Sequence, residues 1–157
     1  MLTELRKEHA LRFVILRFGT IFGMSPGMRF HTAVNKFCWE AAMGQPVSVW
    51  KTALDQKRPY LGLNDAIQSI RLMINQDMFS GELFNVVSSN HTVREIVELI
   101  TESVPDVTVK FVDSLIMNQL SYEVVGRKLC TLGFKPRDNL SIAIKETVSA
   151  LNGVSRN

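Results

Sequence analysis

Several side chains in this 157-residue sequence belong to types that could bind a ligand, although type alone does not single them out. Arg58 carries a guanidinium, the group best suited to bidentate contacts with phosphate. Ser48 and Trp50 lie two residues apart in a segment that alternates like a strand, so both point to one face, where the indole offers a flat apolar wall. The amide of Asn35 offers both donors and an acceptor. Each residue also has an ordinary interpretation, as a solvated arginine, a core tryptophan or an exposed helix asparagine.

Three glycines at intervals of four, Gly19, Gly23 and Gly27, do not form a dinucleotide-binding loop. Such a loop needs closely spaced glycines between a strand and the start of a helix. Here Pro26 interrupts the series and the pattern predicts a turn. The three histidines have no spacing that indicates a metal site, so we expect no bound metal.

The composition is that of one ordinary globular domain. Hydrophobic residues make up 46% and charged residues 21% of the sequence, which excludes wholesale disorder. The net charge of +3 is small and scattered, which argues against nucleic acid as a partner but suits an anionic small molecule. No apolar run is long enough to cross a membrane, so we expect no membrane partner. We expect Cys38 and Cys130 to be core thiols of a reduced, cytoplasmic protein.

The apolar pattern predicts an α/β chain that positions the candidate residues on short strands and helices. The segment 13–16 is expected to be a fully buried strand, and 19–28 a turn-rich stretch. Further strands are predicted at 47–50, 58–63, 83–87 and 107–112, and helices at 2–10, 32–43 and 139–151.

Two more helices are indicated by their first turns. Asn64 or Asp65 can cap one of them. Its predicted apolar face consists of Ala66, Ile67, Ile70, Met73 and Ile74. Thr92 and Glu95 form a capping box at the start of the other, and Gly44 has the position of a helix C-terminal glycine.

Short motifs follow one another along nearly the whole chain. They are LRFGTIFG at 16–23, SPGMRF at 25–30, NKF at 35–37, AMGQPVSVW at 42–50, QKRPY at 56–60, DA at 65–66, FNV at 84–86, SYEVV at 121–125 and LGF at 132–134. The ordered series resembles the extended short-chain dehydrogenases, the family of NAD-dependent nucleotide-sugar epimerases and dehydratases that includes UDP-galactose 4-epimerase. The resemblance implies an α/β fold that is the C-terminal, substrate-binding part of such an enzyme, with a remnant of the Rossmann sheet and small mixed sheets packed by helices.

The resemblance also implies a role for each candidate residue. Five of them are implied to bind the substrate, namely Thr20, Asn35, Ser48, Trp50 and Arg58. The asparagine would hydrogen-bond the substrate, the serine and tryptophan would lie alongside the nucleotide base, and the arginine would clamp the diphosphate. Phe18 and Thr20 would lie beside the NAD cofactor, although a plain turn threonine is the alternative at the second position.

The catalytic tyrosine–lysine pair of this family is absent from the sequence. That chemistry needs a lysine four residues after the tyrosine. Tyr60 is followed at that distance by Asn64, and Tyr122 by Gly126. An arginine that many relatives place shortly before the second tyrosine is also missing from 117–120. We expect the pair to lie upstream of the first residue, so that NAD serves the complete enzyme and this chain alone neither binds a cofactor nor catalyses.

We therefore expect residues 1–157 to form a single α/β substrate-binding domain, with 1–24 as the residual end of the dinucleotide-binding domain. The principal hypothesis is a portion of an enzyme of carbohydrate metabolism whose partners are a nucleotide sugar and a missing N-terminal cofactor half. One alternative is a stand-alone, non-catalytic nucleotide-sugar-binding module. Another is a remnant that forms homo-oligomers through exposed core surface. The resemblance leaves open both the sugar and the reaction, whether epimerisation, dehydration or reduction.

Overall fold

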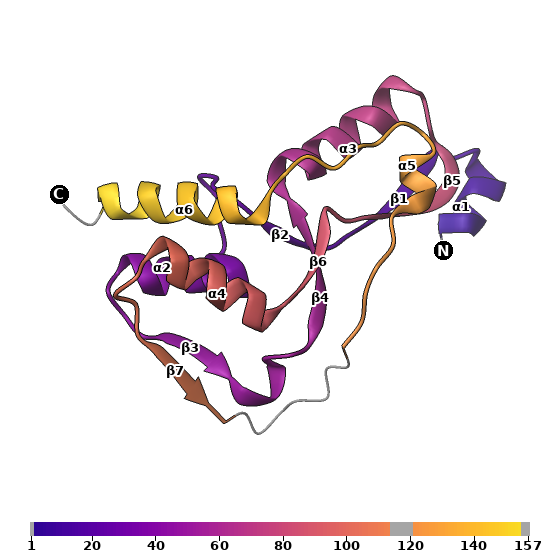
Figure 1. Cartoon of the computed structure of the whole chain (residues 1–157). Coiled ribbons are helices and arrows are strands. Elements are labelled where there is room, and N and C mark those ends of the chain that lie inside the picture. Colours follow the sequence, from indigo (N-terminus) through magenta and orange to yellow (C-terminus); the bar gives the residue numbers. More distant parts are fainter. Residues whose placement is uncertain (1, 114–120, 155–157) are drawn as a thin grey trace.

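Helices and short strands alternate along the chain in the computed structural model, which describes residues 2–113 and 121–154 (Figure 1). The helices are α1 (Leu2–His9), α2 (Ala33–Ala42), α3 (Leu63–Asn75), α4 (Val93–Ser103), α5 (Arg127–Cys130) and α6 (Leu140–Val154), and Lys51–Ala53 forms a 3-10 helix. The strands are β1 (Phe13–Phe18), β2 (Thr20–Phe22), β3 (Val47–Trp50), β4 (Lys57–Gly62), β5 (Ser80–Val86), β6 (Ser89–Thr92) and β7 (Val109–Val112). The predicted α/β architecture is confirmed. None of the helices in the described ranges is both long and apolar enough to cross a membrane.

The strands pair in three small sheets. β1 pairs with β5 in a parallel two-stranded sheet, and β3 pairs with β7 in another. The third sheet has the order β2–β4–β6, with a parallel β2–β4 pair and an antiparallel β4–β6 pair. Figure 1 shows this third sheet between two regions that contain most of the helices. Residues on β2 and β4 therefore lie where the two regions meet.

The α2–α4–α6 region consists of these three helices, which pack against one another, together with β3 and β7 (Figure 1). Each helix contributes fully buried side chains, among them Cys38 from α2, Ile96 from α4 and Ile144 from α6. The helix boundaries follow the sequence signals. Thr92 Oγ1 accepts a hydrogen bond from Glu95 N at 3.1 Å and Glu95 Oε2 accepts one from Thr92 N at 2.8 Å, so the predicted capping box is confirmed.

The β1–β5–α3 region consists of α1, β1, β5, α3 and α5. Its core contains Phe84 from β5 and Leu129 from α5. α3 contributes Ala66 and Met73 to that core. Three isoleucines of the predicted apolar face remain exposed, namely Ile67 (45%), Ile70 (43%) and Ile74 (58%). The apolar face of α3 is thus only partly covered by the described residues.

Two sequence predictions about the β1–β5–α3 region are wrong. β1 is half-buried at its first four residues rather than fully buried, because among the described strands only β5 pairs with it. Cys130 is exposed on α5, so only Cys38 is a core thiol. The predicted turn-rich stretch 19–28 also contains a short strand, since Thr20–Phe22 forms β2 beside β4.

The start of α3 is capped differently from the prediction, which assigned the cap to Asn64 or Asp65. α3 begins at Leu63, and the Asp138 carboxylate accepts a hydrogen bond from Asp65 N at 2.9 Å. In return, the Asp65 carboxylate accepts from the backbone N–H groups of Arg137 and Asp138 at 2.9 and 3.1 Å. It also accepts from a serine hydroxyl on the loop after β5 at 2.6 Å. This reciprocal capping joins the start of α3 to the segment that leads into α6.

Candidate functional site

A hollow of about 400 Å³, which we call the site pocket, opens between the start of α2 and strands β3 and β4. Its walls carry aromatic, hydroxyl and cationic side chains drawn from segments far apart in the sequence. The volume lies in the range of small-molecule sites, roughly 300–1,000 Å³. The site pocket is therefore the first place to look for the predicted ligand-binding residues.

Four of the five predicted substrate-binding residues line the site pocket. They are Thr20 from β2, Ser48 and Trp50 from β3, and Arg58 from β4. The predicted alternation of β3 is confirmed, because its two valines are buried while Trp50 is 46% exposed. Trp50 is therefore not a core tryptophan. The role of these residues in binding a substrate stays a prediction.

Asn35, the fifth predicted residue, is a buried residue of α2 and is not among the residues that line the site pocket. Its Nδ2 donates to the carbonyl oxygen of Arg29 at 3.2 Å, and its Oδ1 accepts from Gly23 N at 3.4 Å. These bonds hold the loop between β2 and α2 against the helix. In this structure the Asn35 amide therefore has a structural role, because it fixes the loop that leads into α2.

The guanidinium of Arg58 is held in place from several sides. It donates to the backbone carbonyl of Lys57 and to Oε1 of Gln56, both at 2.9 Å. The ring of Tyr122 lies against it, with 5.1 Å between the guanidinium carbon and the ring centroid. Because the guanidinium is planar, these contacts fix the direction in which it can meet an anion.

A second cation, Lys36, lines the site pocket and was missed by the sequence reasoning. Its Nζ lies 3.5 Å from Oε1 of Glu40, one helical turn further along α2, and donates to the carbonyl oxygen of Ser48 at 3.4 Å. The buried carboxylate of Glu40 also accepts from the Ser48 hydroxyl at 2.7 Å and from its backbone N at 3.1 Å. The spacing of lysine and glutamate by four residues was the available signal.

The first turn of α2 forms another wall of the site pocket and suits a negative charge. The first N–H groups of a helix have no acceptor within the helix, and the helix dipole makes this end positive. Thr32 occupies the N-cap position, yet its side chain makes no capping bond. Its Oγ1 is buried and is the one such side-chain atom without a hydrogen-bond partner among the residues that the structure describes. A bound anionic oxygen would suit the free N–H groups of this first turn.

Tyr60 also lines the site pocket but does not suit a catalytic base. Burial raises the pKa of Tyr60 to about 12, although the positive charge of Arg58 opposes that rise. The phenol therefore keeps its proton at neutral pH. Within residues 2–113 and 121–154, no group of three or more histidine, cysteine, aspartate or glutamate side chains could hold a metal ion.

Phe18, the predicted cofactor-binding residue, lies at the end of β1 and is 38% exposed. It is not among the residues of the site pocket, whereas Thr20 is. β1 continues through Gly19 directly into β2, so no helix begins there to hold a dinucleotide's phosphates. The junction of β1 and β2 is therefore not a phosphate-binding loop, and the cofactor roles of Phe18 and Thr20 stay predictions. The segment 117–120, where the sequence lacks an arginine that many relatives have, lies outside the described residues.

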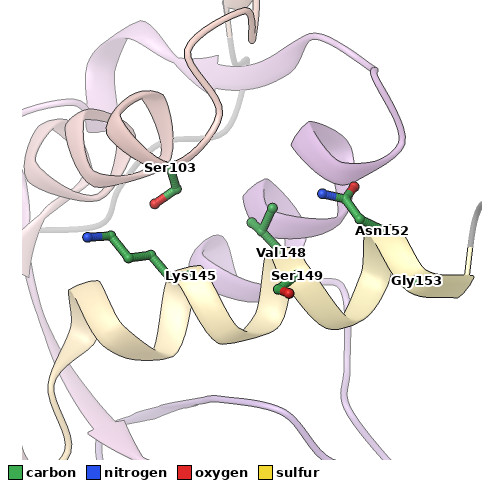
Figure 2. Close-up of a pocket in the computed structure, with 6 residues that line it drawn as sticks. All are labelled: Ser103, Lys145, Val148, Ser149, Asn152 and Gly153. Atoms are coloured by element: carbon green, nitrogen blue, oxygen red, sulfur yellow. The ribbon is translucent and has the colours of Figure 1, made fainter.

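A different hollow of about 430 Å³ lies between the end of α4 and the last turns of α6 (Figure 2). Figure 2 shows Lys145 extending from α6 towards Ser103, with Ser149 and Asn152 further along the helix. The hydroxyl of Ser103 donates to a backbone carbonyl of its own helix at 2.8 Å. This hollow has one cation and no aromatic lining residue, so it suits a nucleotide less well than the site pocket does.

Comparison with known proteins finds similarity to nucleotide-sugar enzymes, as the motifs do. The spinach (Spinacia oleracea) chloroplastic UDP-sulfoquinovose synthase is 31% identical over 121 residues, which are 68% of this chain and 24% of that protein. The fold is similar to UDP-glucuronic acid 4-epimerase from Bacillus cereus, with a TM-score of 0.84, 18% identity and coverage of 97% of this chain and 49% of that chain. It is also similar to UDP-glucose 4-epimerase from Thermus thermophilus, with a TM-score of 0.77, 22% identity and coverage of 97% and 50%. Both of these structures were solved in complex with NAD.

The chain therefore spans about half the length of the solved structures that it matches and about a quarter of the spinach protein. The sequence profile of the NAD dependent epimerase/dehydratase family matches residues 1–87. Because this match covers more than half of the sequence, the chain belongs to the NAD dependent epimerase/dehydratase family.

Proposed function

We propose that the site pocket binds the nucleotide diphosphate of a nucleotide sugar, and that this chain is the substrate-binding portion of an NAD-dependent epimerase or dehydratase. The observation that carries the proposal is the convergence of Trp50, Arg58 and Lys36 on one hollow at the start of α2. An exposed indole suits a base or ribose, while two cations and a helix N-terminus suit a diphosphate. The name of the spinach relative and the ligand of the Bacillus cereus structure make UDP the nucleotide to test first.

The chain is proposed to need another polypeptide portion for catalysis. Neither tyrosine has a lysine four residues later, and Tyr60 keeps its proton at neutral pH. In this proposal residues 1–24, which include β1, belong to the end of a dinucleotide-binding domain. The exposed isoleucines of α3 support this, because they provide apolar surface for a further domain to cover.

Calorimetric titration of the chain tests the proposal directly. The ligands are UDP, UDP-glucose, dTDP-glucose, GDP-mannose and NAD, each added separately at the same ionic strength. We expect a nucleotide sugar to bind with one-to-one stoichiometry and NAD to give no heat. Binding of NAD alone, or of no nucleotide sugar at all, would contradict the proposed function of the isolated chain.

Replacement of Arg58 by alanine identifies the site. We expect Arg58→Ala to weaken nucleotide-sugar binding at least tenfold, since one hydrogen bond to a charged group contributes about 1.5–3 kcal/mol. Arg12→Ala is the matched control, because Arg12 also lies over an aromatic ring, at 5.6 Å from the Phe79 centroid, but lines no part of the site pocket. Equal affinities for the two variants would remove Arg58 from the binding site.

An oligomerisation module is the second candidate function, and the open face of α3 is the observation that favours it. Ile67, Ile70 and Ile74 recur at helical spacing and form a continuous apolar row. Light scattering coupled to size-exclusion chromatography distinguishes the candidates. Oligomerisation would be favoured over substrate binding by two results together. The unaltered chain would be a dimer that Ile70→Glu converts to a monomer, and it would bind no nucleotide sugar.

A further inference from the structure

A separate polar groove of about 370 Å³ lies along α3 and shares no residue with the site pocket. We call it the α3 groove. One wall is a face of α3 on which Asn64, Gln68, Arg71 and Asn75 recur at intervals of three and four residues. The other wall is the segment 133–138, which connects α5 to α6.

The two carboxylates beside the α3 groove are already occupied by donors of the chain itself. Asp65, 2% exposed, accepts from the backbone N–H groups of Arg137 and Asp138 and from the Ser88 hydroxyl. Asp138 accepts from Asp65 N and from Nδ2 of Asn64 at 3.1 Å. These bonds fix the two walls relative to each other. They also orient both carboxylates towards backbone and amide donors rather than towards the cations of the groove.

Three cations of the α3 groove have no carboxylate partner among residues 2–113 and 121–154. Arg71, Lys135 and Arg137 are exposed and line the groove. No ion pair formed within the described residues involves any of them. Leu72, which is half-buried, and Phe134, which is 6% exposed, give the groove an apolar base. Two guanidiniums, an ammonium and several amide donors thus border one hollow that has apolar carbon beneath it.

We propose that the α3 groove is a second ligand site, which binds a small phosphate-bearing anion independently of the site pocket. Guanidiniums bind phosphate in bidentate fashion, and the amides of Gln68 and Asn75 supply further donors. The volume is that of a small-molecule site, and the reciprocal capping holds the walls in place before a ligand arrives. A compact phosphorylated molecule therefore fits this groove better than an extended acidic peptide does.

The test uses inorganic pyrophosphate as the probe and the double variant Lys36→Ala/Arg58→Ala as the starting protein, so that binding in the site pocket is suppressed. We expect pyrophosphate to bind this variant and to shift the backbone amide NMR signals of 64–75 and 133–138. Adding Arg71→Gln and Arg137→Gln should weaken that binding at least about tenfold, since each removes a charge-assisted contact. The matched control adds Arg12→Gln and Arg94→Gln, which change the net charge equally outside both hollows.

The outcomes separate this proposal from the proposed function of the site pocket. Selective loss of binding with the Arg71 and Arg137 changes supports a second site, whether or not nucleotide sugars bind the unaltered chain. Equal loss with the control pair would show unspecific attraction to a positive surface and overturn the proposal. Absence of pyrophosphate binding would also overturn it. The same holds if a polyglutamate peptide, titrated separately, binds the groove and pyrophosphate does not. Unchanged thermal unfolding of each variant verifies that the fold is intact.

Discussion

Helices α2 and α3 both repeat apolar residues along one face, yet the structure covers the face of α3 less completely than that of α2. Phe37 and Cys38 of α2 are at most 5% exposed, because α4 and α6 pack over them. Ile70 and Ile74 of α3 are 43% and 58% exposed. The same sequence pattern thus has two outcomes. Which one holds depends on whether another element of the described chain reaches that face.

The difference separates a region that completes its own core from one that leaves part of its apolar surface open. In the α2–α4–α6 region three helices enclose a common core with β3 and β7. In the β1–β5–α3 region a two-stranded sheet and α3 have fewer neighbours (Figure 1). Amphipathicity therefore predicts that a face will be buried by something, and it does not say by what.

The largest effect is expected where isoleucines of the two regions are compared directly. Ile144→Ala should lower the free energy of unfolding by about 2–5 kcal/mol, because the side chain is fully buried on α6. Ile70→Ala should change it by no more than about 0.5 kcal/mol, since that residue lies at the surface and is 43% exposed. Urea unfolding followed by circular dichroism measures both. Equal losses would show that the α3 face is covered in solution.

A smaller effect is expected at the junction of the two regions. Asp65→Asn keeps the side-chain size but removes one acceptor oxygen, so at least one buried donor of the segment before α6 loses its partner. We expect a loss of about 1–3 kcal/mol in the free energy of unfolding. Asp55→Asn, which alters an exposed carboxylate paired with Arg94, is the control and should change stability far less, because solvent screens an exposed ion pair. If the two variants are equally stable, the reciprocal capping contributes little.

The smallest effect on stability at neutral pH is expected at the two cysteines, because their contribution changes only in alkali. Burial raises the pKa of the Cys38 thiol from 9.0 to about 12, so the folded chain holds this proton more tightly than the unfolded chain does. That contribution to stability is complete below pH 9 and is lost as the pH rises from about 9 to 12. Thermal unfolding across this range should show a shallower decline for Cys38→Ala. Cys130→Ala, at an exposed position of the other region, should retain the slope of the unaltered chain.

The fold could be predicted from the sequence wherever one local signal determines one element. The Thr92–Glu95 capping box marked the start of α4, and the alternation of β3 correctly separated the buried valines from Trp50. The start of α3 could not be located in this way. Its cap comes from Asp138, more than seventy residues away, and tertiary contacts of that kind leave no local pattern. The exposure of Cys130 was missed for the same reason, since an apolar neighbourhood in sequence does not fix packing in space.

Part of the candidate site could be predicted from the sequence. Thr20, Ser48, Trp50 and Arg58 were proposed on a family resemblance, and the structure brings all four to one hollow. Lys36 was missed because a lysine on an amphipathic helix usually faces solvent, and only the fold shows Glu40 and Ser48 holding it at the pocket. The unpaired Thr32 hydroxyl could not be foreseen either, because hydrogen-bond satisfaction depends on the assembled neighbours.

The parallel sheets have a consequence for how this chain folds. Phe13 pairs with Ser80 and Val47 pairs with Val109, so each ladder joins residues separated by more than sixty positions. The entropy of closing such long loops must be overcome before the first ladder hydrogen bond forms, which slows folding. During synthesis from the amino terminus, β1 leaves the ribosome long before β5 exists to pair with it. Until then the apolar residues of β1 lack their partner strand and remain exposed to other chains.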